Sequence, residues 1–406
     1  MTADGLPRLV SVDDHVMEPA EIWTSRLPSR LREHGPHVRR ERGVLGWDDL
    51  TARWSLGGQD AEWADVWYYD DLVWVLQRGF VQAGYVHEDP QRPITYDDML
   101  PGAYQREERL RAMERNHTDV SICFPNMIRF CGQIFLDRKD KDLALLCVKA
   151  YNDWMIDEWC GAERPARLVP LTIVPLWDVH LAAAEVRRCA AKGAHAVTFP
   201  EAPPGLGLPS IFSSYWDPLF AACEETDTVL NLHVGSSSKS VTTAADAPRD
   251  MAVCFLFVNS QLAFSDWLYS GLLEDFGRLK IVLSEGQVGW MPFVVQRIDN
   301  TWKKSPERKE KRARRAKQLP SSAIPGRVFG CIFDDLEGLV NRHAIGTEQI
   351  MVETDFPHSD STYPHSRDVL SKLVSEAGLT ESETRQITRE NAIRVYGLDR
   401  YFGISS

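Results

Sequence analysis

Residues 279–285 read LKIVLSE, and residues 349–356 read QIMVETDF. In both stretches a short run of branched apolar residues is followed by a carboxylate, so an acidic side chain stands near the carboxyl end of an expected strand. The runs are apolar on both faces, as in parallel strands that are covered on both sides. These two stretches therefore predict buried parallel strands that lead into an acidic site.

Runs of the same kind recur along the chain, and segments with helical spacing separate them. Asp140–Trp159, Trp177–Ala191 and Met291–Lys304 each place apolar residues at helical intervals. Strands and helices in this alternation predict an α/β fold, a (β/α)8 TIM barrel. An open doubly wound sheet would give a similar alternation, but no GxGxxG or Walker motif favours it. The expected strands are Arg8–His15, Asp119–Pro125, Arg167–Trp177, His195–Glu201, Thr228–Gly235, Leu279–Glu285, Arg327–Asp334 and Gln349–Phe356.

Two segments fall outside the repeat. Residues 18–116 form a long insertion, rich in Trp and Tyr, between the first two strands. Loops of this length are usually lids or oligomer arms, and a structural flap is the alternative. The other segment, Lys303–Lys317, is a basic run without interleaved aromatic residues, which favours a solvated surface over a nucleic-acid site. We expect residues 1–406 to form a single barrel domain with 18–116 as its insertion.

Composition narrows the class of protein. The 406 residues carry a formal net charge of −12, which gives no general attraction to nucleic acid or anionic lipid. Eight scattered cysteines without a CxxC pair are typical of reduced thiols. The amino terminus has no signal-peptide pattern, and no apolar run has the length of a membrane span. The sequence predicts a cytoplasmic protein.

Side chains that can bind metal stand at the ends of four expected strands. Taken singly, each could be a helix cap or a hydrogen-bonded core residue. The carboxyl ends of barrel strands meet at one face, so together they indicate a site for one or two divalent ions, zinc, manganese or iron. The candidate ligands are Asp13 and His15 on the first strand, His233 on the fifth, Glu285 on the sixth, Asp355 on the eighth, and His358 just beyond it.

The sequence contains the segments SVDDHVMEP (11–19), LNLHVGSSS (230–238), KIVLSEGQVGWMPF (280–293), ETDFPHSDS (353–361) and ITRENAIRVYGL (387–398). Together these segments resemble the amidohydrolase-2 family, the relatives of aminocarboxymuconate-semialdehyde decarboxylase. The resemblance implies a TIM barrel with a divalent metal at its mouth. It assigns Asp13 and His15 to the first-strand ligand pair, His233 to the mid-barrel ligand and Asp355 to the last-strand acid. Glu285 departs from the pattern, because the decarboxylases carry an acid/base histidine there.

Three functions are compatible with this set of residues. The first is hydrolysis by metal-activated water or metal-assisted decarboxylation, with Asp355, Glu285 and His358 as catalytic groups. The second applies if Glu285 and His358 are also ligands. The site would then be similar to the dinuclear manganese or iron centre of oxygen-dependent hydroxylases of the aminoisobutyrate hydroxylase type. The third is a catalytically silent barrel subunit of a hetero-oligomer.

Substrate contacts are expected near the same mouth. Arg129, in PNMIRFCGQ (125–133), can pair with the carboxylate of a small-molecule substrate. Ser236 and His365 follow strand ends and are further candidates for substrate binding. Glu201 is expected to anchor a loop, with a bridging metal ligand as the alternative. The Trp-rich insertion favours a homo-oligomer or a hetero-oligomer with a related chain.

Overall fold

The computed structural model describes residues 5–42, 44–48, 53–56, 62–161, 167–238, 241, 244, 246–305 and 315–399. For 44–48, 53–56, 249–250 and 252 it describes the backbone alone.

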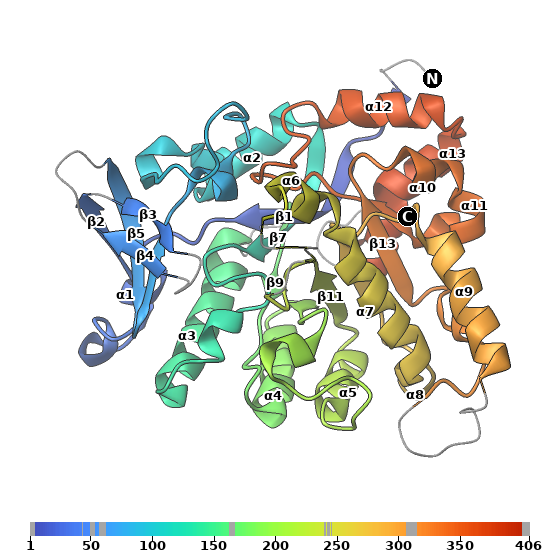
Figure 1. Cartoon of the computed structure of the whole chain (residues 1–406), viewed down its shortest axis with the longest axis horizontal. Helices are drawn as coiled ribbons and strands as arrows, with labels where there is room; N and C mark the ends of the chain where they lie inside the picture. The colour runs from blue at the N-terminus through green and yellow to red at the C-terminus, as the bar shows by residue number, and fades with distance from the viewer. Residues whose placement is uncertain are drawn as a thin grey trace.

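A closed barrel of parallel strands lies at the centre of the molecule (Figure 1). Among the described residues, the strand order is β8-β7-β1-β14-β13-β12-β11-β10-β9. Only Pro170 separates β8 from β9, so the two ends of this order meet and the sheet closes. This arrangement confirms the TIM barrel. The strands are β1 (Leu9–Val16), β7 (Thr118–Pro125), β8 (Leu168–Val169), β9 (Leu171–Thr172), β10 (Ala196–Thr198), β11 (Val229–His233), β12 (Ile281–Ser284), β13 (Val328–Ile332) and β14 (Ile350–Val352).

Each expected strand has a counterpart in the barrel, and one differs in form. Arg167–Trp177 was expected as one strand, but only the short β8 and β9 form within it. Pro170 lies between them and has no N–H to donate to a ladder, so the strand is interrupted there. Most of the other strands end earlier than their apolar runs, because the last residues of each run turn into the loops that carry the site.

Helices cover the outside of the barrel (Figure 1). The three helices expected from apolar spacing are present as α3, α4 and α9, and α3 and α4 begin at aspartate caps, Asp140 and Asp178. Most of the basic run after α9 lies outside the described residues. The main helices are α2 (Arg106–Arg115), α3 (Lys141–Trp154), α4 (Val179–Ala191), α5 (Asp217–Glu225), α6 (Arg249–Cys254), α7 (Phe257–Ser270), α8 (Leu272–Asp275), α9 (Met291–Lys304), α10 (Leu336–Val340), α11 (Arg342–Ile345), α12 (Ser366–Glu376), α13 (Glu381–Arg385) and α14 (Asn391–Tyr396).

The apolar core has two layers. The larger layer lies between the strands and the surrounding helices. A second cluster combines residues of the barrel strands, such as Val12, Phe124 and Met351, with Ile393 and Tyr396 from the region of α14. The centre of the Phe124 ring lies 4.9 Å from that of the His233 ring, so this inner layer packs against a residue of the candidate site.

The described part of the insertion 18–116 folds beside the barrel, with its strands at the left of Figure 1 and α2 near the top. Its Trp23 and Trp67 are buried in a core shared with α3, whereas Trp63 is half exposed. A tight turn at Arg78–Val81 reaches the barrel mouth, where the Phe80 carbonyl accepts a hydrogen bond from Asn126 Nδ2 at 3.1 Å. Its function as a lid or subunit contact stays a prediction. Its main elements are α1 (Ile22–Arg26), β2 (His37–Arg42), β3 (Val44–Asp48), β4 (Arg53–Leu56), β5 (Trp63–Tyr69), β6 (Leu72–Val75) and α2.

Two further features bear on the class of protein. Within the described part of the chain, we find no helix with the length and apolar character needed to cross a bilayer. All eight cysteines are free thiols, and only Cys254 is exposed.

Candidate metal centre

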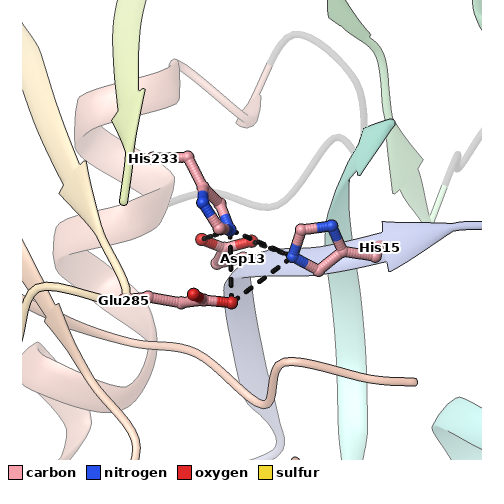
Figure 2. A group of neighbouring side chains, drawn as sticks. All are labelled: Asp13, His15, His233 and Glu285. Atoms are coloured by element: carbon pink, nitrogen blue, oxygen red, sulfur yellow. Dashed lines mark hydrogen bonds and ion pairs between the residues drawn. The ribbon is translucent and has the colours of Figure 1, made fainter. Parts of the chain in front are cut away.

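Asp13 and His15 point from β1 toward His233 and Glu285 (Figure 2). The pairing of β1 with β7 shifts register between Ser11 and Asp14. Bulges of this kind re-aim side chains next to active sites. His233 ends β11 and Glu285 directly follows β12, so three segments far apart in the sequence deliver these four side chains.

The four side chains are spaced as the ligands of one ion would be. His15 Nε2 lies 3.1 Å from His233 Nε2 and 3.5 Å from both Asp13 Oδ1 and Glu285 Oε1. His233 Nε2 lies 3.2 Å from Glu285 Oε1 and 3.6 Å from Asp13 Oδ2. An ion that binds its ligands at about 2.1 Å separates neighbouring ligand atoms by roughly 3.0–3.4 Å. The group therefore fits a divalent cation.

A second group overlaps the first. Asp355 Oδ1 lies 3.4 Å from His15 Nε2 and 3.0 Å from His358 Nδ1, and Glu285 Oε1 lies 3.5 Å from the same His358 nitrogen. In each group of four, one ligand atom from every residue lies within 4.8 Å of the others. The resemblance implied Asp13, His15, His233 and Asp355 as one set. In the structure, Glu285 rather than Asp355 is the fourth member beside Asp13, His15 and His233.

Buried oxygen atoms without hydrogen bonds support cation binding. Among the described residues, both Asp13 oxygens, Glu285 Oε1 and Asp355 Oδ1 have no hydrogen-bond partner. Buried carboxylate oxygens that accept no hydrogen bond are costly, and a divalent cation is the usual partner that removes this cost. The residues present thus fit the metal that their chemistry implies.

The electrostatics of the cluster lead to the same conclusion. Burial, together with the charges of Glu353 and Glu285, raises the pKa of Asp13 well above its ordinary value. Burial and Glu285 likewise raise the pKa of Asp355. Burial also works to raise the pKa of Glu285, but His233, His15 and the other nearby imidazole outweigh it and hold that pKa well below its ordinary value. Burial and mutual repulsion therefore oppose the ionisation of all three carboxyl groups together, and a cation would relieve both effects.

One hydrogen bond fixes which nitrogen of His233 can bind a cation. His233 Nδ1 lies 2.6 Å from the Val234 carbonyl, which can only accept, so Nδ1 carries the proton. Nε2 then presents its lone pair to the cluster, the arrangement found in metal-binding histidines. The ring of Phe130 stacks on His233 with the centroids 4.1 Å apart and limits its rotation.

Both acidic residues that follow barrel strands have left-handed backbones. The φ angle is 55° at Glu285 and 51° at Asp355, and it is also positive at Arg129 and Ser238 nearby. Such a conformation costs a non-glycine residue about 1–2 kcal/mol and persists where the surroundings impose it, commonly at functional sites. The strands β12 and β14 therefore end before these acidic residues, and the chain turns there toward the barrel mouth.

A cavity of about 320 Å³ opens beside the cluster. Apolar and aromatic side chains form much of its wall, and Glu285, Asp355 and His358 form part of it. A cavity of this size and composition suits a small organic ligand. Its lining residues are Gly79, Phe80, Arg129, Phe130, Val234, Gly235, Ser238, Val253, Leu256, Glu285, Asp355, His358, Ser359 and Asp360.

Arg129 lies in this cavity wall. Burial lowers the pKa of its guanidinium, and the opposing contribution comes from Cys131 rather than from a carboxylate. Among the described residues the Arg129 side chain has no ion-pair partner. An anionic group of a ligand would satisfy it.

The other substrate candidates lie elsewhere. Ser236 Oγ accepts a hydrogen bond from the Glu201 backbone at 2.9 Å, and Ser238 lines the cavity instead. His365 is exposed at the start of α12, so the structure does not bring it to the cavity wall. Glu201 Oε1 accepts hydrogen bonds from Gly235 N at 2.9 Å and Ser237 Oγ at 2.8 Å, consistent with the expected loop anchor.

Sequence reasoning missed two buried glutamates. Glu353 accepts a hydrogen bond from the Glu285 backbone N–H at 3.1 Å, which helps to hold Glu285 at its positive φ. Glu18 accepts from the backbone N–H groups of Asn126, Met127 and Ile128, the loop that leads to Arg129. Glu353 lies two residues before Asp355, and Glu18 begins the insertion. Glu353 directly follows an apolar run and so shares the signal that indicated Asp355, whereas Glu18 has no local signal that separates it from a surface acid.

Fold and site together define a barrel enzyme with a divalent-metal centre at its mouth. The family model described as amidohydrolase matches residues 62–398. The chain therefore belongs to the amidohydrolase family, and it is a metal-dependent enzyme of the hydrolase or carboxy-lyase kind.

Solved structures with the same fold include three that cover nearly the whole chain. An amidohydrolase from Mycobacterium avium subsp. paratuberculosis K-10 is 20% identical, with a TM-score of 0.68 and coverage of 96% of this chain and 99% of that one. The IDCase of Metarhizium anisopliae is 19% identical, with a TM-score of 0.66 and coverage of 98% and 99%. A dihydroxybenzoic acid decarboxylase from Polaromonas sp. JS666, solved with manganese and the inhibitor 2-nitroresorcinol, is 16% identical, with a TM-score of 0.60 and coverage of 97% and 98%. No curated protein matches the chain.

Proposed function

We propose that this protein is a metal-dependent decarboxylase of a small carboxylic acid with a flat, apolar body. The observation that carries the proposal is the position of Arg129, a guanidinium without an ion-pair partner among the described residues, in the same cavity wall as the metal cluster. The fold is also that of decarboxylases such as the manganese-containing enzyme of Polaromonas sp. JS666.

Binding and orientation come first. The side chains of Phe80, Phe130 and Leu256 offer an apolar surface to a flat substrate, and Arg129 pairs with an anionic group on it. Asp13, His15, His233 and Glu285 would hold the cation, which when bound supplies a Lewis acid that stabilises negative charge on the substrate. The apolar walls exclude water and so strengthen these interactions.

Proton transfer completes the reaction. Loss of carbon dioxide leaves the electron pair of the broken carbon–carbon bond on the substrate, and that carbon must then take up a proton. In this proposal His358 donates it, because His358 lines the cavity and its Nδ1 lies 3.0 Å from Asp355 Oδ1. Asn126 Nδ2, 3.4 Å from His358 Nε2, orients the ring from the other side.

A panel of hydroxybenzoic acids tests the proposal. Manganese-loaded protein should release carbon dioxide and the decarboxylated phenol in equal amounts from at least one of these acids. Gas analysis measures the carbon dioxide, and chromatography measures the phenol. Arg129→Met should raise KM by about tenfold or more at unchanged metal content, because a charge-assisted hydrogen bond of roughly 1.5–3 kcal/mol is lost.

Arg138→Met is the matched control. Arg138 bonds to Asp71 and to the Tyr69 carbonyl and does not line the cavity, so its loss should leave KM unchanged. Manganese-loaded protein that releases no carbon dioxide from any member of the panel would reject decarboxylation of this class of acid.

A second candidate is an oxygen-dependent hydroxylase with two metal ions. One observation favours it. Glu285 belongs to both ligand groups, and its Oε1 lies 3.2 Å from His233 Nε2 and 3.5 Å from His358 Nδ1. A carboxylate in that position can bridge two ions. Metal counting separates the candidates, since a decarboxylase of the proposed kind needs one ion per chain and the hydroxylase needs two.

A further inference from the structure

Asp14 stands between two candidate metal ligands but bonds to other strands. Its carboxylate is only 2% exposed. Oδ1 accepts hydrogen bonds from Thr354 Oγ1 at 2.6 Å and from the Phe356 backbone N–H at 3.1 Å, and Oδ2 accepts from Ser121 Oγ of β7. One side chain of β1 therefore bonds to the strand on one side and to the segment after β14 on the other.

The partners of Asp14 bracket a metal ligand. Thr354 and Phe356 are the two neighbours of Asp355, just as Asp13 and His15 are the two neighbours of Asp14. Backbone bonds tie the same segments together, from Asp355 N to the Asp13 carbonyl at 3.0 Å and from His15 N to the Phe356 carbonyl at 2.7 Å. Asp355 has a positive φ, a conformation that persists only when its surroundings impose it.

Arg109 of α2 reaches the same layer from outside the barrel. It is 1% exposed, and its Nε donates to the Gly102 carbonyl at 2.7 Å while Nη2 donates to the His15 carbonyl. Its guanidinium also lies 4.6 Å from the centre of the Phe356 ring. Arg109 thus contacts the backbone of one ligand and the residue that follows another.

We infer that Asp14 and Arg109 are positioning residues of the metal centre, which hold Asp13, His15 and Asp355 in their coordinating arrangement from the outer face of the barrel. Both residues face away from the cluster, so they act through the backbone that carries the ligands. The inference rests on the metal centre of the proposed function and is independent of the reaction. Groups that orient ligands in this way typically change metal affinity by about 10- to 100-fold when they are replaced.

Manganese affinity measures this effect directly. Metal-free full-length protein is titrated with Mn²⁺, and free Mn²⁺ is followed by electron paramagnetic resonance. Asp14→Asn keeps the size of the side chain and should raise Kd by roughly 10- to 100-fold. Arg109→Lys keeps the charge but cannot reach both carbonyls with one ammonium group, so it should also raise Kd.

Glu185→Gln is the matched control. Glu185 is a buried carboxylate of α4 that accepts from Asn152 Nδ2 at 2.8 Å and pairs with Arg188, away from the strands that bear ligands. It should lower thermal stability without changing Kd. If Asp14→Asn does not fold, Thr354→Val removes the 2.6 Å hydrogen bond from Thr354 Oγ1 to Asp14 while preserving side-chain shape, and it should also raise Kd.

The outcomes are distinguishable. Folded variants at Asp14 and Arg109 that bind Mn²⁺ as tightly as the wild type would overturn the inference. An equal loss of Mn²⁺ affinity in Glu185→Gln would also overturn it. If the variants bind Mn²⁺ more weakly than the wild type, and the wild type decarboxylates no member of the panel, the inference is supported and the proposed reaction is rejected. A wild type that binds no Mn²⁺ would reject both.

Discussion

Glu285 differs from the other carboxylates of the cluster in its electrostatic surroundings. Imidazoles of His15, His233 and His358 surround it and hold its pKa low, whereas burial and like charges raise the pKa of Asp13 and Asp355. Glu285 is therefore the carboxylate that carries charge most readily before a cation binds. It also stands where related decarboxylases are expected to carry a histidine. Replacing Glu285 is therefore an informative test of metal binding by the cluster.

Glu285→Gln tests how many ions the site holds. The proposed decarboxylase predicts one manganese per chain in the wild type. The variant should bind it more weakly through Asp13, His15 and His233, and turnover should fall with the metal that is lost, because the proposal assigns Glu285 to metal binding and proton donation to His358. Elemental analysis of purified protein and initial rates provide the two readouts.

Asp360→Asn is the control for this experiment, because Asp360 lines the cavity outside both ligand groups and should leave the metal count unchanged. Two ions in the wild type and one in Glu285→Gln would contradict the single-ion proposal and support the hydroxylase.

At the scale of elements, the loop after β7 depends on one residue of the insertion. Glu18 is fully buried, and its carboxylate accepts from Met127 N at 2.7 Å and from Asn126 N at 3.2 Å. The same loop supplies Arg129 to the cavity and Phe130 to the stack on His233. The start of the insertion thereby sets the position of one wall of the site.

The stability of this loop should depend on pH. Burial raises the pKa of Glu18 to about 7, against an ordinary value of 4.5, although four backbone N–H donors, including its own, oppose the rise. Because the folded pKa is the higher one, the stabilisation from Glu18 is complete below about pH 4.5 and is lost as the pH rises through about 7. From about pH 5 to about pH 8, the wild type should lose stability relative to Glu18→Gln, by at most roughly 3 kcal/mol.

Urea unfolding at the two pH values, with chelator present throughout, measures this difference. Unfolding free energies of the two proteins that change in parallel with pH would show that Glu18 does not titrate in this range.

For the whole molecule, the closed barrel gathers like charges at one end. Parallel strands bring Asp13, Glu285 and Asp355 to the same mouth, where burial and mutual repulsion raise the pKa values of the two aspartates. In metal-free protein the stabilisation from these aspartates is present at low pH and is lost as the pH rises. A bound cation reverses this dependence, because it prefers the ionised carboxylates.

Manganese should therefore stabilise the fold more strongly at higher pH. At 100-fold excess over Kd the gain in unfolding free energy is about 2.7 kcal/mol, and the rise in Tm should shrink as the pH falls and protons compete for the ligands. Thermal unfolding with Mn²⁺ or with chelator at several pH values measures it. His233→Ala removes a ligand and should abolish the shift. A shift that persists in this variant, or that grows as the pH falls, would contradict ligand binding at this cluster.

Much of this protein could be predicted from local patterns. The alternation of apolar runs with helical segments specified the barrel, because the burial of each element is encoded in its own residues. Carboxylates and histidines after strand ends identified the candidate ligands, because parallel strands all present their carboxyl ends to one face. The helices α3, α4 and α9 were predicted near their observed bounds for the same reason.

Tertiary structure alone decided which of these groups meet. It grouped Glu285 rather than Asp355 with the side chains of Asp13, His15 and His233, and it brought Glu18 and Arg109 from the insertion against segments of the barrel mouth. It also excluded His365 from the cavity wall. The physical reason is that loop conformations, such as the positive φ at Glu285 and Asp355, are imposed by hydrogen bonds from residues distant in sequence. A local pattern can specify that a strand ends in an acid, but the direction in which that acid points depends on its neighbours in the folded barrel.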